Sequence, residues 1–351
     1  MRLKTMLSAG CFTVASMLPL AALPAQAASP VKIVVSYQPA NYWALPFYLA
    51  TKMGWWKDVG LDATYVKFPS GMPQMASAAA GSWDVGATGS VPAVFGAARF
   101  KVLTIGVDND ESATNVMVAD PRTYAALKAD PKKIAGKRIF LTMNSTVDYV
   151  VRSCITHMGV KQSSVHLVNL GQAAIVSALI SHNAKVGGLW APNVYTAEEK
   201  AGAKVVCSGV DAGVTVPGVL IARESYAKAH PKRVAAFLAV YIHAWNWAKA
   251  HPKQAREALK AADTQAGVPL TDHGVSQEFK RPTFTLKQEL AMMESGSGAS
   301  KLDTWMNDIS GFLEKVHSIK KAPEAAAYVA NRYMKLVESD PKLRAFAESS
   351  D

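Results

Sequence analysis

Short apolar runs of strand type alternate with helical patterns along most of the chain. The first three runs span residues 31–36, 62–68 and 83–87, and each is followed by small or polar residues. The apolar positions beyond them recur at spacings of three and four, which is typical of one buried helix face. This alternation predicts an α/β fold. In an open parallel sheet the three strand-to-helix turns would all lie at the carboxyl edge, where ligands bind.

A second set of strands follows the acidic residues 108–112, which we interpret as a crossing between two lobes. A strand over residues 99–107 completes the first set. The second set consists of the runs at residues 115–119, 138–141, 165–169, 186–190 and 204–207. One more strand, at residues 219–222, precedes a part of the chain dominated by helices. The pattern therefore predicts two α/β lobes.

Residues 138–158 contain a strand, a polar turn and the start of a helix. The strand at 138–141 is broken by small polar residues, and the helix that follows ends at Gly159. Ser145 with Asp148 three residues later resembles a capping box, although aspartate is shorter than the usual Glu or Gln. Such a turn presents free backbone N–H groups, so it can hold an anionic or strongly polar group.

The N-terminal residues 1–27 have the pattern of a cleavable secretory signal. Two cations precede an apolar stretch that ends in Ala25-Gln26-Ala27, so the mature chain is expected to begin near Ala28. A membrane span is not expected, because Pro19 and Pro24 interrupt the apolar run. The residues around Cys11 faintly resemble a lipoprotein site, but the apolar region continues after Cys11, so no lipid anchor is expected.

The charge balance is basic but dispersed. The net charge of +11 falls to 11 − 2 = +9 when Arg2 and Lys4 leave with the signal. Lysine and arginine are spread over the chain instead of forming one block, which argues against nucleic-acid binding. A basic protein nevertheless suits an anionic ligand.

Two cysteines, Cys154 and Cys207, remain after processing. The spacing of apolar residues places Cys154 on the buried face of the predicted helix, and Cys207 ends a strand-like run. We therefore expect two separately buried thiols, because a chain of this length can bury a core without cross-links. The alternative is a disulfide, which an oxidising compartment would permit. The sequence has no CxxC motif or metal-type spacing of Cys and His, so no metal site is expected.

Particular motifs connect this order of elements to a known family. They are Phe68-Pro69-Ser70-Gly71, AAGSWDVG at residues 79–86, Thr88-Gly89-Ser90-Val91-Pro92, NSTVDY at residues 144–149 and Trp190-Ala191-Pro192. With these motifs the mature chain resembles the substrate-binding proteins of ABC importers for taurine, alkanesulfonates and nitrate, which are related to thiamine-precursor binding proteins. Residues 230–237 and 281–285 look most like the taurine-binding branch.

This resemblance implies a type II periplasmic binding fold, with two α/β lobes joined by a two-crossing hinge and a ligand cleft between them. The expected domains are a signal peptide at 1–27, lobe I at 28–111, lobe II at 112–218, and the second part of lobe I with the C-terminal helices at 219–351. Ligand would draw the lobes together by closure of the hinge.

The function implied by the resemblance is that of the solute-binding component of an ABC importer. We expect a periplasmic monomer that binds a small organosulfonate, either taurine-like or an alkyl or aryl sulfonate. It would deliver this ligand to a permease and its ATPase at the inner membrane. No bond of the ligand changes, so neither enzymatic activity nor a cofactor is expected.

By motif, the implied ligand-binding residues lie at the strand-to-helix turns of both lobes. In lobe I they are Tyr37, Gln38, Asn41, Trp43, Ser70, Gly71, Thr88, Gly89 and Ser90. In lobe II they are Asn144, Ser145, Thr146, Asp148, Tyr149, Trp190 and Asn193. Converging N–H and O–H donors would satisfy the three sulfonate oxygens without a paired cation. The competing roles are capping for Ser70 and Ser90 and packing for Trp43 and Trp190.

Two positions depart from the family pattern. Asp148 stands where family members commonly have histidine, and its carboxylate would repel a sulfonate unless it turns away to cap the helix. Gly218 stands where a taurine binder would be expected to have an acid for the ligand's ammonium group. Asp108, Asp110, Glu111 or Asp148 could replace that acid. Without a replacement, the ligand would be a plain sulfonate or another small organic solute.

Three alternatives stay open. The first is a binding protein for nitrate, a thiamine-precursor pyrimidine or another aromatic or cationic compound, and the aromatic pair Tyr42-Trp43 would suit a ring. The second is an enzyme of the pyrimidine-synthase type. However, the sequence lacks the cysteine-rich motif of that branch and the GxSxG, HExxH and P-loop motifs. The third is a sensor that presents its ligand to a membrane receptor.

Overall fold

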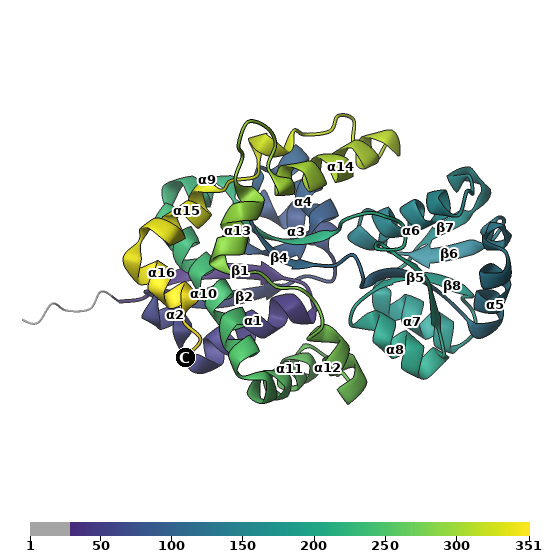
Figure 1. Cartoon of the computed structure of the whole chain (residues 1–351), viewed down its shortest axis with the longest axis horizontal. Helices are drawn as coiled ribbons and strands as arrows, with labels where there is room; N and C mark the ends of the chain where they lie inside the picture. Colours follow the sequence, from purple (N-terminus) through teal and green to yellow (C-terminus); the bar gives the residue numbers. More distant parts are fainter. Residues whose placement is uncertain (1–28, 268) are drawn as a thin grey trace, which may run out of the picture.

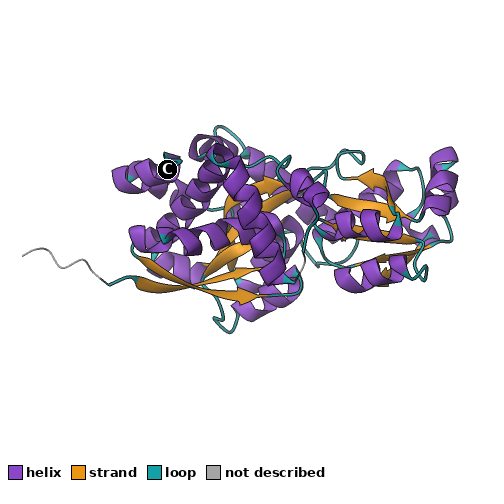
Figure 2. Ribbon diagram, turned by 90° about the horizontal axis from the view of Figure 1, so that it is seen from below, coloured by secondary structure: helices purple, strands orange, loops and turns teal. Residues whose placement is uncertain are grey.

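The computed structural model describes residues 29–267 and 269–351 and contains two five-stranded sheets (Figure 1). The sheets lie at the two ends of an elongated molecule, and helices pack against both (Figure 2). The prediction of two α/β lobes is confirmed. The proposed signal peptide and cleavage site lie outside the described residues. Within the described residues, no helix has the length and apolar character needed to cross a membrane.

We use "lobe I" for the first sheet, with strand order β2-β1-β3-β10-β4, and the helices that cover it. Its strands are β1 (Val31–Tyr37), β2 (Leu61–Lys67), β3 (Val85–Gly89), β4 (Val102–Asp110) and β10 (Pro217–Arg223). β1 is parallel to β2 and β3, whereas β10 lies antiparallel between β3 and β4. The three strands β3, β4 and β10 are buried along almost their whole length, including polar residues such as Thr88, Thr104 and Asp108.

We use "lobe II" for the second sheet, with strand order β7-β6-β8-β5-β9, and its helices. Its strands are β5 (Asn115–Ala119), β6 (Arg138–Leu141), β7 (His166–Asn169), β8 (Val186–Trp190) and β9 (Lys204–Ser208). β6 is parallel to β7 and β8, and β5 is antiparallel to β8 and β9. The chain passes between the sheets from β4 to β5 and from β9 to β10. The domain boundaries at residues 111 and 218 stay a prediction.

The helices form three groups along the chain. Those of the first group are α1 (Asn41–Met53), α2 (Trp55–Asp58), α3 (Gly71–Ala78) and α4 (Ser90–Phe100). Those of lobe II are α5 (Pro121–Ala129), η1 (Pro131–Ile134), α6 (Thr146–His157), η2 (Gln162–Ser164), α7 (Gln172–Ile180) and α8 (Asn193–Ala201). The C-terminal group is α9 (Glu224–Ala229), α10 (Pro231–Ala250), α11 (Pro252–Ala266), α12 (Asp272–Glu278), α13 (Leu286–Met293), α14 (Lys301–Lys315), η3 (Ala325–Ala327), α15 (Arg332–Ser339) and α16 (Pro341–Glu348). α10 is buried almost all round because α1, α11, α15 and α16 pack on it.

Three predicted element boundaries are wrong. The strand expected at residues 83–87 runs over Val85–Gly89 instead, so Thr88 and Gly89 belong to the strand. The strand expected at residues 99–107 begins only at Val102, because α4 continues to Phe100 and ends where Lys101 adopts a left-handed conformation (φ 54°). Asn41 and Trp43, expected at the strand-to-helix turn after the first strand, lie in the helix itself, since α1 begins at Asn41.

The prediction that Cys154 and Cys207 are separate thiols is also wrong. The two cysteines form a disulfide, with their Cα atoms 6.0 Å apart. Cys154 lies on the buried face of α6, as its spacing predicted, and Cys207 lies near the end of β9. α6 packs against β9, which brings the two buried side chains together.

Candidate ligand-binding site

Gln38, Gln74 and Thr88 form a buried polar cluster where β1 and β3 end and α3 begins. The Gln38 side-chain amide donates to Thr88 Oγ1 and to Gln74 Oε1, both at 2.8 Å. Gly71 lies so close to α4 that an added Cβ would be 2.1 Å from Pro92 Cγ. The turns therefore hold one another in place through direct side-chain and backbone contact.

Ser90 is the first residue of α4 and is fully buried. Its hydroxyl has no hydrogen-bond partner among the described groups and does not cap the helix. Ser70, at the N-cap of α3, also makes no capping bond with its side chain. A buried hydroxyl without a partner is uncommon, because it loses its bonds to water and gains nothing in return. Ser90 Oγ therefore retains unused hydrogen-bonding capacity.

The start of α6 is built as a cap, with a register that differs from the predicted box. Ser145 Oγ accepts a hydrogen bond from the Asp148 N–H at 3.4 Å. Asp148 Oδ2 accepts from the N–H of Asn144, one residue earlier than in a reciprocal capping box. Its other oxygen, Oδ1, pairs with Arg152 at 2.7 Å. This geometry favours the capping role that the sequence indicated for Asp148.

The starts of α4 and α6 touch across the two lobes. A Cβ added to Gly89 would lie 2.7 Å from Thr146 Cγ2, so Gly89 is needed for this close approach. Thr146 Oγ1 in turn donates to Asn115 Oδ1 at 2.9 Å. Both helices point their first turns, the positive ends of their dipoles, at this contact between the lobes.

The polar contacts continue from Thr146 into the first crossing of the hinge. Asn115 Nδ2 donates to Glu111 Oε2 at 2.9 Å, while Glu111 Oε1 is buried without a partner among the described groups. A Cβ added to Gly218 would lie 2.1 Å from Asp108 Oδ1 and 2.6 Å from Glu111 Oε1. Two acids thus pack against the glycine at which the family pattern predicts an acid. We call the chain of contacts from Gly89 and Thr146 to these acids, together with the neighbouring Ser90, the interlobe network.

The two hinge acids are difficult to ionise. Burial raises the pKa of Glu111 to about 7, although Arg281 and Asn115 act in the opposite direction. Burial and the nearby Glu111 raise the pKa of Asp108 well above its usual range, despite the hydrogen bond that Trp43 Nε1 donates to Asp108 Oδ2 at 2.7 Å. A cation beside this pair would favour the ionised carboxylates and lower both pKa values.

The sequence did not predict Glu278 and Arg281 as part of this region. Arg281 pairs with Glu278 at 2.8 Å, and both side chains are almost fully buried. The guanidinium also lies 3.7 Å from the centre of the Tyr42 ring and donates to Asn109 Oδ1. Tyr195 of lobe II lies beside Glu278. Residues 281–285 had carried a family resemblance, but no local pattern indicates that the end of α12 contacts the hinge.

The remaining candidate residues are spread around this network. Trp190 pairs with Asn115 in the sheet, and Asn193 begins α8. Tyr37 instead lines a separate cavity of about 350 Å³ between α1 and α11. Tyr149 packs its ring against Phe312 of α14, at a centroid distance of 4.7 Å. The structure therefore brings Gln38, Trp43, Thr88–Ser90 and Thr146 toward the interlobe network, but not Tyr37 or Tyr149.

Glu289 of α13 gives the fold a testable pH dependence. Its Oε2 accepts the Val107 N–H of β4 at 2.9 Å, and burial raises its pKa from 4.5 to about 8. The folded protein therefore holds a proton that the unfolded chain releases, so this contribution to stability is full below pH 4.5 and is lost as pH rises through about 8. Glu289→Gln keeps the acceptor and removes the titration. The free energy of unfolding of this variant, measured in urea between pH 5 and pH 9, should fall less with rising pH than that of the wild type. Glu111 and Asp263 act in the same direction, but they are present in both the wild type and the variant. Equal slopes of unfolding free energy against pH in the two proteins would therefore contradict the assignment to Glu289.

Comparison with known proteins gives consistent matches. A family model described as "NMT1/THI5 like" matches residues 41–255. A putative aliphatic sulfonates-binding protein of Bacillus subtilis is 26% identical over 248 residues, which cover 69% of this chain and 72% of that protein. The taurine-binding periplasmic protein of Escherichia coli is 28% identical over 191 residues, which cover 54% of this chain and 58% of the relative.

Solved structures share the fold at low sequence identity. The periplasmic aliphatic sulphonate binding protein of Escherichia coli superposes with a TM-score of 0.69 at 17% identity, covering 86% of this chain and 92% of that one. The periplasmic nitrate-binding protein of Synechocystis PCC 6803 superposes with a TM-score of 0.70 at 11% identity, covering 92% of both chains. The two sheets with their helices are thus the fold of periplasmic binding proteins.

Proposed function

Because this chain belongs to the NMT1/THI5-like family, we propose that it is the periplasmic solute-binding component of an ABC importer and that its ligand is a small organosulfonate. Relatives of the chain are named for aliphatic sulfonates and for taurine. The protein would carry its ligand to a membrane permease and leave every bond of it intact. Turnover of a bound ligand by the purified protein would contradict this non-enzymatic role.

The observation that carries the proposal is the convergence of α4 and α6 on the interlobe network. The first turns of both helices have N–H groups without intrahelical partners, and their dipoles favour a negative group. Ser90 adds a buried hydroxyl without a partner among the described groups, whereas the Thr146 hydroxyl donates to Asn115 and fixes the first turn of α6 from the other lobe. A sulfonate needs several donors at once, and this pair of helix starts offers them from both lobes.

The hinge acids favour a sulfonate whose other end is positively charged. Asp108 and Glu111 lie on the same network, and Arg281 is already paired with Glu278. An ammonium group would favour the ionised carboxylates and pair with them, whereas a plain alkyl chain would not. We therefore favour an aminoalkanesulfonate of the taurine type. Thermal-shift measurements with taurine, alkanesulfonates, aryl sulfonates and nitrate test this, because a bound ligand raises the melting temperature by mass action. Stabilisation by uncharged or cationic solutes alone would contradict the sulfonate proposal.

A pair of substitutions separates ligand binding from stability. Ser90→Ala combined with Thr146→Val should weaken binding of the best sulfonate by about 1–3 kcal/mol, because the first change removes an unpaired donor and the second removes the hydroxyl that ties the start of α6 to Asn115. Ser90→Ala alone should not lower the melting temperature of the ligand-free protein, since Ser90 Oγ makes no hydrogen bond there. Calorimetric titration and thermal melting measure the two effects.

Thr104→Val provides the matched control for this pair. Thr104 is also a buried hydroxyl without a hydrogen-bond partner among the described groups, but it lies on β4 outside the interlobe network. Affinity should be unchanged in this variant. If the Ser90 and Thr146 variant also binds with wild-type affinity, the sulfonate does not sit at the starts of α4 and α6.

The same acids support a second candidate, a cationic aromatic solute such as a pyrimidine precursor of thiamine. Asp108 and Glu111 would bind its positive group, and Tyr42 and Trp43 lie on the adjoining first turn of α1. Adding such pyrimidines to the thermal-shift panel distinguishes the candidates. Stabilisation by the pyrimidines, with no response to any sulfonate, would select this second function.

A further inference from the structure

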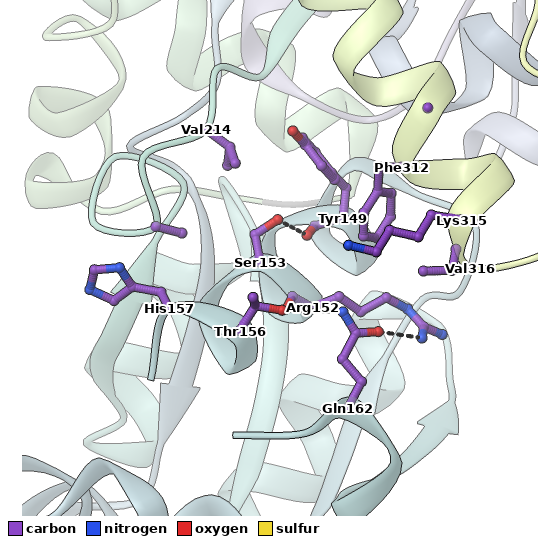
Figure 3. Close-up of a pocket in the computed structure, with 12 residues that line it drawn as sticks. Tyr149, Arg152, Ser153, Thr156, His157, Gln162, Val214, Phe312, Lys315 and Val316 are labelled. Carbon is purple, nitrogen blue, oxygen red and sulfur yellow. Dashed lines mark hydrogen bonds between the residues drawn. The ribbon is translucent and has the colours of Figure 1, made fainter. Parts of the chain in front are cut away.

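A cavity of about 640 Å³ lies between α6 of lobe II and α14 of lobe I (Figure 3). We call it the α6–α14 groove. Tyr149, Arg152 and Thr156 line it from α6, and Phe312 and Lys315 line it from α14. The passage from β9 to β10 adds Ala212 and Val214. The groove is thus built from both lobes and from the crossing between them, and its size is in the range of small-molecule sites.

The charged groups that line the groove are cationic. Arg152 and Lys315 reach it from opposite helices, and its lining contains no aspartate or glutamate. Acids near the groove include Asp148, which pairs with Arg152 at 2.7 Å, and Asp308, one helical turn before Phe312. Glu314 and Asp211 neighbour lining residues in sequence but do not line the groove themselves. Lys315 forms no salt bridge with a described carboxylate and is solvent-exposed. Its charge therefore faces the groove without being neutralised by direct pairing.

The wall of the groove next to these cations is aromatic. The rings of Tyr149 and Phe312 meet edge to face, with centroids 4.7 Å apart, and they come from different lobes. Burial, with a contribution from Asp308, raises the pKa of Tyr149 to about 12, so its hydroxyl is neutral at physiological pH. Figure 3 shows Lys315 extending from α14 toward α6, between Tyr149 and Arg152. Aromatic surface beside Lys315, unpaired among the described residues, and the partly engaged guanidinium of Arg152 suits a flat ring that carries an anionic group.

We propose that the α6–α14 groove is a second binding site, which takes a small aromatic anion such as an aryl sulfonate or aryl carboxylate. Lys315 and Arg152 bind the anionic group, and the ring packs against Tyr149 and Phe312. A molecule held in this way contacts both lobes, so it stabilises the arrangement in which α6 and α14 face each other. The site uses none of the groups of the interlobe network and does not depend on the function proposed above.

The test is calorimetric titration with benzenesulfonate and with methanesulfonate, which has the same anionic group but no ring. The wild type should bind benzenesulfonate more tightly than methanesulfonate at the groove. Lys315→Gln should weaken the binding of benzenesulfonate about tenfold, which is the effect of losing a charge-assisted hydrogen bond. Phe312→Leu should weaken the binding of benzenesulfonate but leave the affinity for methanesulfonate unchanged. Lys315→Arg should retain binding, which shows that Lys315→Gln acts through charge and not through the fold.

Two controls make the outcome unambiguous. Lys320→Gln changes the net charge equally at an exposed position outside the groove lining, so affinity should not change. The Ser90→Ala and Thr146→Val variant should retain the groove site even if it loses a sulfonate from the interlobe network. The proposal is overturned if Lys315→Gln and Phe312→Leu both bind benzenesulfonate like the wild type. It is also overturned if the Ser90 and Thr146 variant loses all binding of benzenesulfonate.

Discussion

Replacing Arg281 with methionine should lower the free energy of unfolding by about 3–5 kcal/mol, the usual cost of breaking a buried ion pair from one side. Both side chains of the Arg281–Glu278 pair are almost fully buried. The substitution would leave Glu278 without its cation and would remove the guanidinium from the face of Tyr42. Burial already raises the pKa of Glu278 with Arg281 in place. The loss should therefore be smaller at pH 5 than at pH 8, since the remaining carboxyl group can then be protonated.

Urea denaturation of two further variants checks this expectation. Glu278→Gln with Arg281→Met removes both charges and should recover part of the stability, because an uncharged buried pair has no unpaired ion. Lys228→Met breaks the exposed pair with Glu224 and should cost no more than about 0.5 kcal/mol. A loss of less than about 1 kcal/mol in Arg281→Met would mean that water or another group replaces the guanidinium.

Removing the Cys154–Cys207 disulfide by alanine at both positions should cost about 4 kcal/mol. The bond joins residues separated by 53 positions, so it strongly restricts the unfolded chain of lobe II. Alanine is a better replacement than serine, because both sites are buried and the serine hydroxyl would add a polar group without a hydrogen-bond partner. Urea denaturation of the variant gives the value, and the wild type treated with a reductant should match it. If reduction leaves the midpoint of unfolding unchanged, the disulfide contributes nothing to stability.

The disulfide also illustrates what the sequence could not predict. The helical spacing correctly assigned Cys154 to the buried face of α6, and the apolar run correctly assigned Cys207 to a strand. Whether they pair depends on the packing of α6 against β9, a contact between elements that are distant in sequence. Periodicity determines which face of an element is buried, but not which partner covers that face.

In the candidate site, too, contacts within one turn were predictable and contacts between distant elements were not. The capping role of Asp148 was predictable, because Ser145 and Asp148 interact within one turn of α6. The proximity of Asp108 and Glu111 to Gly218 could only be hypothesised from the family pattern, since the residues belong to different crossings of the hinge. The role of Arg281 was missed, because it depends on where α12 docks. Local rules thus predicted the strands and helix starts, while the charged contacts between them arise from tertiary structure.

The position of β10 has a consequence for the order in which the protein can fold. β10 lies between β3 and β4, and these two strands are not paired with each other. The first sheet therefore has a gap in the middle until residues 217–223 insert, and those residues follow all of the second sheet along the chain. The strands of the second sheet, in contrast, come from one uninterrupted segment, residues 115–208. Lobe II can thus be complete while the edges of β3 and β4 are still open, which makes the half-formed first sheet the stage most exposed to wrong strand pairing.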